Sequence, residues 1–173
     1  MRKHRSRAGM ADMHSTRLFF ILLLALVNSA FAESCWESAA QRYGIHVSIL
    51  HAIAKTESAI NVRAMNRNAN GSVDVGLMQI NSLWFPRLAE MGIEPEDLWD
   101  ECTSVHVGAW VLAGYIRRFG YNWRAVGAYN AGPSSSPESE LKRKKYAQRV
   151  FHNLSASNPA DGLRIRAGDA GDS

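Results

Sequence analysis

Apolar residues recur along most of this chain at the three- and four-residue steps of helices. Val47, Leu50, Ile53 and Ala54 share one face, which predicts a helix over Val47–Glu57. A longer stripe predicts a helix that ends at Gly120, and its members are Val105, Ala109, Leu112, Ile116 and Phe119. Similar patterns predict helices over Cys35–Tyr43, Leu77–Leu88, Asn122–Tyr129 and Glu138–Asn153.

Strand patterns are almost absent, because no segment sustains the alternation of a half-buried strand. Asn66–Val75 contains the turn-rich run Asn68-Ala69-Asn70-Gly71-Ser72 and predicts a small hairpin. Gly108 and Gly114, inside the long helix, suggest a close helix crossing. We therefore expect a mainly α fold in one domain, with at most a small β-hairpin.

The amino end has the features of a secretory signal over residues 1–32. Basic residues between Arg2 and Arg17 precede the ten-residue apolar run Leu18–Val27, and Ala30-Phe31-Ala32 offers a cleavage site. Ten apolar residues are too few to span a bilayer. Met10 or Met13 is an alternative start. Residues 33–153 are expected to form the domain, and residues 154–173, rich in Ser, Asn, Gly, Ala and Asp, a disordered tail.

The excess of basic over acidic residues in this chain lies within the predicted signal. The sequence has 20 Lys plus Arg and 16 Asp plus Glu, and the first 32 residues hold five and one of these. The remaining chain carries 15 of each, so bulk charge does not favour a nucleic-acid partner. The local run Lys142–Lys145 is interpreted as a solvated helix face in preference to a docking patch.

Glu57 is the first candidate for chemistry. It follows the apolar face of its helix, so its carboxyl points toward the interior or a cleft wall. Burial and the negative end of the helix dipole both raise a carboxyl pKa. A carboxylic acid protonated near neutral pH can donate to a glycosidic oxygen. The alternative is a helix-end Glu that rotates out to solvent.

Two later motifs favour the site interpretation. In Gly76-Leu77-Met78-Gln79-Ile80, Gly76 lets backbone approach a ligand, Met78 offers a soft apolar surface and Gln79 is an uncharged donor and acceptor. In Ala128-Tyr129-Asn130-Ala131-Gly132, Tyr129 can place its hydroxyl against a carboxyl, and Asn130 adds an amide. Ordinary core packing is the alternative for Met78 and Tyr129.

Glu57-Ser58, the Gly76–Ile80 motif and the Ala128–Gly132 motif, in that order, resemble the signatures of the soluble lytic transglycosylase family. Asp74-Val75, Asn81 and the run Lys145–Val150 extend the resemblance over roughly residues 35–152. It implies a lysozyme-like fold and cleavage of peptidoglycan. The small size, the two cysteines and the Asn-rich loop resemble the branch that includes invasion-associated and conjugation-associated enzymes.

The resemblance implies a role for each residue. Glu57 is the catalytic acid and then base, Ser58 steadies the carboxyl or the substrate, and Tyr129 hydrogen-bonds Glu57. Gln79 and Asn130 hold N-acetyl or hydroxyl groups. Such enzymes cleave the β-1,4 bond between N-acetylmuramic acid and N-acetylglucosamine without water, because the muramic C6 hydroxyl attacks C1. One carboxylate suffices if the acetamido group stabilises the oxocarbenium-like centre.

Cys35 and Cys102 lie in the exported part of the chain, where an oxidising compartment favours a disulfide. That bond is worth roughly 4 kcal/mol in the chain-entropy model. A catalytic thiol is the rival, but no Cys-His-Asn pattern accompanies it. The histidines lack metal-ligand spacing, so we expect no metal and no cofactor.

Three hypotheses follow. The first is a periplasmic lytic transglycosylase that opens peptidoglycan for a secretion apparatus of type III or type IV. The second is a hydrolytic muramidase with Asp74 as its second carboxylate. The third is a non-catalytic peptidoglycan-binding or assembly protein, which has no use for an intact acid. None requires a membrane span once the signal is removed.

Overall fold

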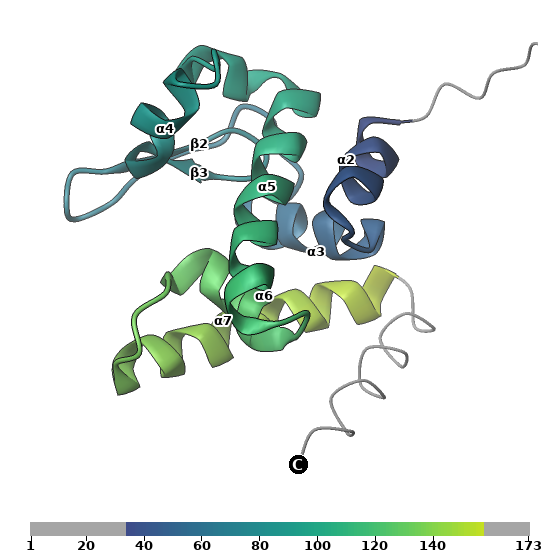
Figure 1. Ribbon diagram of the computed structural model, residues 1–173, viewed down its shortest axis with the longest axis vertical. Helices are drawn as coiled ribbons and strands as arrows, with labels where there is room; N and C mark the ends of the chain where they lie inside the picture. Colours follow the sequence, from purple (N-terminus) through teal and green to yellow (C-terminus); the bar gives the residue numbers. More distant parts are fainter. Residues whose placement is uncertain (1–33, 158–173) are drawn as a thin grey trace, which may run out of the picture. The chain divides into compact units, whose positions relative to one another are not determined.

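Helix α5 (Glu101–Phe119) is the central element of the fold. The computed structural model describes residues 34–157. The side chain of Asp100 accepts a hydrogen bond from the Thr103 N–H at 2.8 Å and caps the helix, which ends at Gly120. Its predicted stripe faces the core, and Val105, Ala109 and Leu112 are fully buried. Figure 1 shows α5 running through the middle of the fold, beside the sheet.

Four more helices were predicted from the sequence and are confirmed. They are α2 (Cys35–Tyr43), α3 (Val47–Ser58), α6 (Trp123–Ala131) and α7 (Pro137–Ser157). α7 continues four residues past its predicted end because Leu154 is buried in the core. Residues 154–157 of the predicted tail belong to α7, whereas residues 158–173 and the predicted signal, residues 1–32, lie outside the described residues.

The hairpin predicted within Asn66–Val75 is present and belongs to a three-stranded antiparallel sheet. Its strands are β1 (Met65–Arg67), β2 (Val73–Val75) and β3 (Ile80–Asn81), in the order β1-β2-β3. Asn66 pairs with Asp74, and Asp74 pairs with Asn81. The third strand was not predicted, because two residues are too few to show a period.

The helix predicted over Leu77–Leu88 is wrong. Gln79 has a positive φ of 49°, which a helix cannot contain. The Asn81 side chain accepts from the Leu83 N–H at 3.0 Å and starts the 3₁₀ turn η1 (Ser82–Trp84). Pro86 then lies at the start of the short helix α4 (Phe85–Ala89), where its missing N–H costs nothing. A second 3₁₀ turn, η2 (Pro95–Trp99), leads into α5.

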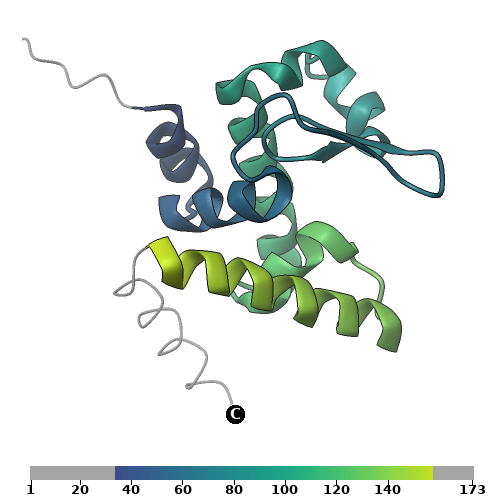
Figure 2. The ribbon, with the colours of Figure 1, turned by 180° about the vertical axis from the view of Figure 1, so that it is seen from behind.

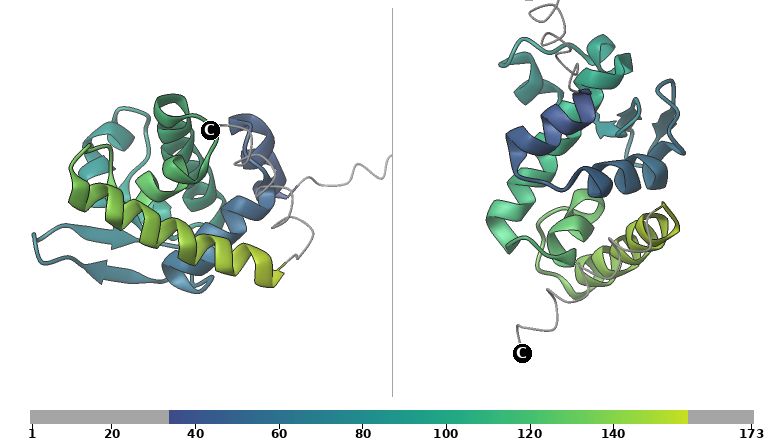
Figure 3. Two further views of the ribbon diagram at one scale, coloured as in Figure 1. Left: turned by 90° about the horizontal axis from the view of Figure 1, so that it is seen from below. Right: turned by 90° about the vertical axis from the view of Figure 1, so that its right-hand side faces the viewer.

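α7 packs against α6 and α3, and α5 packs against α2 and α6. Figures 2 and 3 show α7 lying alongside α3 and α6. The close helix crossing is at Gly127 of α6, where a Cβ would lie 2.5 Å from the Arg143 carbonyl oxygen of α7. The prediction for Gly108 and Gly114 is therefore corrected. Gly108 makes room for the Met78 side chain, and Gly114 has no atom of another element against it.

A disulfide joins Cys35 of α2 to Cys102 of α5, with their Cα atoms 5.3 Å apart. The predicted pairing is confirmed, and the catalytic-thiol alternative is removed. The bond fixes α2 against the first turn of α5. Within residues 34–157, no helix is long and apolar enough to cross a membrane.

Candidate active site

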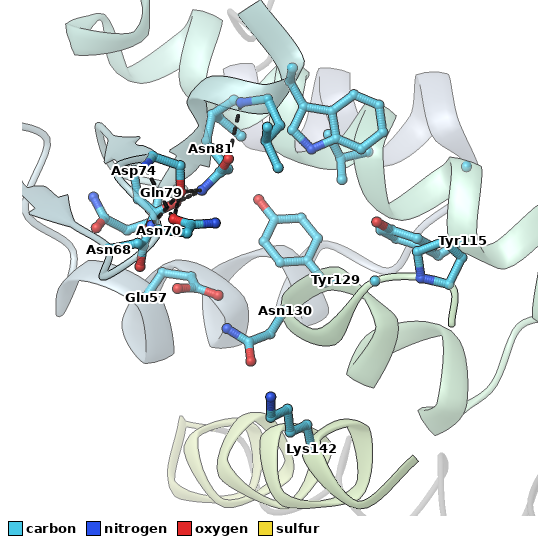
Figure 4. A pocket seen from close by; sticks show the side chains of 18 of the residues that line it. Glu57, Asn68, Asn70, Asp74, Gln79, Asn81, Tyr115, Tyr129, Asn130 and Lys142 are labelled. Atoms are coloured by element: carbon cyan, nitrogen blue, oxygen red, sulfur yellow. Dashed lines mark hydrogen bonds between the residues drawn. The ribbon is translucent and has the colours of Figure 1, made fainter. Parts of the chain in front are cut away.

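A cleft of about 1080 Å³ separates the sheet from α6 and α7. The sheet and its loops line one side, α5 forms a wall, and Glu57, Tyr129, Asn130 and Lys142 line the remainder. Figure 4 shows Glu57, Tyr129 and Asn130 around one space, with the amides of the sheet opposite. The structure thus brings the three sequence motifs together at a single cleft.

Glu57 lies in the last turn of α3, one residue before the helix ends. The chain then turns sharply through Ala59 and Ile60, whose φ angles of 53° and 64° are left-handed. For a β-branched residue such as Ile60 this backbone conformation is a strained outlier. This left-handed pair ends helix α3 within three residues of Glu57.

Half-burial raises the pKa of Glu57 to about 7, because the charged form loses its hydration. A hydrogen bond from Tyr146 and the positive charge of Arg149 oppose this and lower the pKa, while the charge of Asp74 raises it further. Glu57 is therefore about half protonated near neutral pH. This is the state that a general acid requires.

The hydroxyl of Tyr146 in α7 donates to Oε1 of Glu57 at 2.5 Å. The resemblance assigned this contact to Tyr129, and the structure corrects that assignment. Tyr146 is 1% exposed, so its ring is fixed by packing and its hydroxyl holds the carboxyl in one orientation. The sequence carries a signal for this role, because Tyr146 shares a buried face with Val150 and Leu154 on an otherwise charged helix.

The Tyr129 hydroxyl donates instead to the Met78 carbonyl oxygen at 2.9 Å. Its ring stacks on that of Tyr146, with centroids 6.5 Å apart. Burial is the main reason that the pKa of both tyrosines is raised well above 10, and the negative charge of Glu57 raises each pKa further. Both hydroxyls thus remain protonated donors across the physiological pH range. Tyr129 lines the cleft and also ties α6 to the Gly76–Ile80 motif.

Ser58 connects the end of α3 to the same motif. Its hydroxyl lies 2.7 Å from the Leu77 carbonyl oxygen and accepts from the Asn61 N–H at 3.1 Å. The prediction that Ser58 steadies the carboxyl or the substrate is corrected, because its bonds go to backbone. Its effect on Glu57 is through the position of the helix end.

Gln79 faces the cleft, but both of its N–H donors are engaged by backbone. They donate to the carbonyl oxygens of Gly76 at 2.8 Å and of Ala64 at 3.0 Å. The amide oxygen is therefore the polar atom of Gln79 that remains for a ligand in the cleft, and it can accept from a sugar hydroxyl or N–H.

Gly76 and Met78 were predicted to contact the ligand, but neither is among the residues that line the cleft. A Cβ at Gly76 would lie 2.1 Å from the Leu98 carbonyl oxygen, so the glycine lets the motif pack against η2. Met78 is 0% exposed and packs on Gly108 of α5. The core interpretation of Met78 is correct, and the contribution of Met78 to the site is its carbonyl oxygen.

A network of side-chain amides covers the sheet side of the cleft. Asp74 accepts from Asn68 at 2.8 Å, from Asn81 at 2.6 Å and from Asn66 at 3.4 Å. Both carboxylate oxygens of Asp74 are therefore occupied. Asn130, exposed at the end of α6, adds an amide from the opposite side. The wall is rich in uncharged donors and acceptors, which suit sugar hydroxyl and acetamido groups.

The model of the transglycosylase SLT domain family matches residues 34–151, which include every element around the cleft. The chain belongs to the transglycosylase SLT domain family. Within residues 34–157 of this family member, no cluster of His, Cys, Asp and Glu is arranged to hold a metal ion.

Curated relatives resemble this transglycosylase SLT domain protein over most of their length. Invasion protein IagB of Salmonella typhimurium is 46% identical over 138 residues, which are 78% of this chain and 84% of IagB. Protein IpgF of Shigella flexneri is 44% identical over 154 residues, 87% of this chain and 99% of IpgF. The X polypeptide of Escherichia coli is 35% identical over 148 residues, 85% and 88% of the two chains.

Among solved structures, an inactive mutant of the lytic transglycosylase Slt from Pseudomonas aeruginosa has a TM-score of 0.57 and 20% identity to this SLT domain protein. The match covers 83% of this chain, which spans 28% of the length of the solved enzyme. The lysozyme-like fold expected from the sequence is thereby confirmed.

Proposed function

We propose that this protein is an exported lytic transglycosylase. It cleaves the β-1,4 bond between N-acetylmuramic acid and N-acetylglucosamine in peptidoglycan and leaves a 1,6-anhydromuramic end. The observation that carries the proposal is the single available carboxyl of the cleft. Glu57 has a pKa of about 7, whereas the other carboxyl group among the described lining residues, Asp74, is held by three amides.

The proposed reaction uses Glu57 twice. As an acid, it gives its proton to the glycosidic oxygen, and the bond from that oxygen to muramic C1 breaks. The acetamido group of the muramic sugar stabilises the positive centre at C1, which replaces the second carboxylate of most glycosidases. The Glu57 carboxylate then takes the proton of the C6 hydroxyl as the C6 oxygen bonds to C1, so the acid is regenerated.

The surrounding residues serve this double role. Tyr146 orients the carboxyl and, together with Arg149, stabilises its charged form, while burial stabilises its neutral form. The two opposing effects leave the pKa near the working pH, where an acid–base group is most effective. Gln79, Tyr129 and Asn130 border the substrate at the same cleft.

A water-using muramidase and a non-catalytic binding protein are less well supported. A hydrolytic mechanism needs a second carboxylate to activate water or to form a glycosyl intermediate. The occupied oxygens of Asp74 do not favour that role. A binding protein has no need of a carboxyl whose pKa is raised by burial and tuned by a buried tyrosine.

The biological setting that we propose is local opening of the periplasmic cell wall for a secretion apparatus of type III or type IV. Two observations support it. One relative, at 46% identity, carries the name "Invasion protein IagB". The sequence pattern of residues 1–32 is that of a secretory signal.

Glu57→Gln tests the catalytic assignment. The amide has the shape of the acid and can still accept from Tyr146, but it has no proton to give to the glycosidic oxygen. We expect sugar binding to remain and clearance of a cell-wall suspension to fall at least a hundredfold. Asp74→Asn is the comparison, and its loss should be modest because Asp74 only holds the amide network. Equal clearance by Glu57→Gln and wild type would refute the assignment.

A further inference from the structure

The charges of the cleft are unevenly distributed. The sheet side carries uncharged amides and the amide-held Asp74, whereas the described cations that line the cleft come from helices α5 and α7. They are Arg118 and Lys142. Neither belongs to the three sequence motifs, and neither takes part in the proposed chemistry at Glu57.

Each cation belongs to a helix that lines the cleft. Arg118 follows Val111 and Tyr115 along the face of α5 that lines the cleft. Lys142 extends from α7, and Figure 4 shows its ammonium directed toward Asn130. Between the two helices, the loop that contains Gly132 also lines the cleft. The buried side chain of Arg143 holds this loop, because its Nε donates to the Gly132 carbonyl oxygen at 3.1 Å.

The charges of Arg118 and Lys142 are available to a ligand. Lys142 forms an ion pair of 2.8 Å with Glu138, but both side chains are exposed, at 61% and 76%. Such pairs contribute little and exchange readily with a ligand. The Arg118 guanidinium lies 5.5 Å from the centroid of the Phe119 ring, and within residues 34–157 it forms no ion pair with a carboxylate.

We propose that Arg118 and Lys142 form a subsite for carboxylates carried by the muramic sugar. The inference rests on the proposed function, because it concerns the same cleft. N-acetylglucosamine is uncharged, whereas N-acetylmuramic acid carries a lactyl group that ends in a carboxylate or in an acidic stem peptide. A cationic wall beside a wall of neutral amides would therefore select the acidic sugar and set the register of the glycan across Glu57.

The test is a binding measurement on Glu57→Gln protein, so that no ligand is cleaved. Three glycan strands of equal length are compared: one with acidic stem peptides, one with the stem carboxylates amidated, and one stripped to the free lactyl carboxylate. Carboxylate-bearing strands should bind about tenfold more tightly than the amidated strand at low salt, and the difference should shrink as salt rises. Adding Arg118→Gln and Lys142→Gln should reduce that preference to within twofold.

Two further variants serve as controls. Lys144→Gln with Lys145→Gln also removes two positive charges, both from α7, but these side chains line hollows away from the cleft. That pair should keep the preference. Glu138→Gln releases Lys142 from its ion pair and should increase the preference.

The outcomes separate the inference from the proposed function. If the Arg118→Gln, Lys142→Gln protein loses its preference for only one of the two carboxylate-bearing strands, the result supports the subsite. It also shows whether the stem peptide or the lactyl group supplies the carboxylate. An unchanged preference in the Arg118→Gln, Lys142→Gln protein overturns it, as does an equal loss on all three strands. If wild-type protein yields no 1,6-anhydro ends while the preference holds, the proposed function fails and the subsite stands.

Discussion

At the scale of single residues, the acidity of Glu57 results from opposed influences. Burial raises its pKa, and the Tyr146 hydroxyl and the Arg149 charge lower it. The sequence predicted the acid and the direction of its shift, because Glu57 continues an apolar helix face. It did not identify Tyr146 as the partner, because a contact across 89 residues between two helices leaves no local pattern.

Tyr146→Phe should separate the effect of the Tyr146 hydroxyl on the Glu57 carboxyl from the packing of the Tyr146 ring. Losing the hydroxyl removes an influence that lowers the Glu57 pKa, so that pKa should rise. Because activity needs protonated Glu57, the alkaline limb of the kcat/KM profile should move to higher pH by about half a unit to one unit. The maximal rate should fall about tenfold as the carboxyl loses its orientation. Tyr129→Phe, whose hydroxyl binds the Met78 carbonyl oxygen, should lower activity without that upward shift.

The raised pKa of Glu57 also predicts a cost in stability. The folded protein holds the Glu57 proton up to a pH of about 7, whereas the unfolded chain releases it near 4.5. The stability that depends on protonated Glu57 is therefore full below pH 4.5 and is lost as pH rises through 7. Glu57→Gln should raise the free energy of unfolding at pH 8 by between about 1 and 3 kcal/mol. Urea unfolding at pH 8 and pH 4 measures this, and a gain of equal size at both values would contradict the assignment.

At the scale of elements, the helices were predictable, but the backbone conformation of the Gly76–Ile80 motif was not. The apolar stripes of α3 and α5 have a clear period, so their existence follows from the sequence. Leu77, Met78 and Ile80 are buried in a helix-like pattern although they occupy a turn and a strand. The positive φ of Gln79 and the cap at Asn81 decide the backbone there, and neither appears in the spacing of apolar residues.

Gly127→Ala tests the crossing of α6 and α7, the helices that place Asn130 and Tyr146. A Cβ would lie 2.5 Å from backbone oxygen of α7, so the two helices must separate. We expect a loss of about 2 kcal/mol or more in the free energy of unfolding. Gly114→Ala is the matched control, because its nearest atom, at 3.7 Å, is the end of the flexible Arg117 side chain. It should be neutral or stabilising by up to about 1 kcal/mol. Equal losses in the two variants would show that the crossing is not close.

At the scale of the whole domain, long-range contacts assemble the cleft. Ser58 binds the Leu77 carbonyl oxygen, Tyr129 binds that of Met78, and Tyr146 binds Glu57, so four segments converge on one carboxyl. The Cys35–Cys102 bond was predictable because only one pairing was available. The convergence was foreseen only through the family resemblance, since the residue patterns alone left core packing open for Met78 and Tyr129.

The most direct test of the account is the origin of the new chain end. Purified peptidoglycan is digested in water enriched in heavy oxygen, and the products are analysed by mass spectrometry. If the C6 hydroxyl attacks C1, each new muramic end will be a 1,6-anhydro sugar, lighter by one water than a reducing end and free of the label. New reducing ends that carry heavy oxygen would instead show that water is the nucleophile, and would contradict the proposed mechanism.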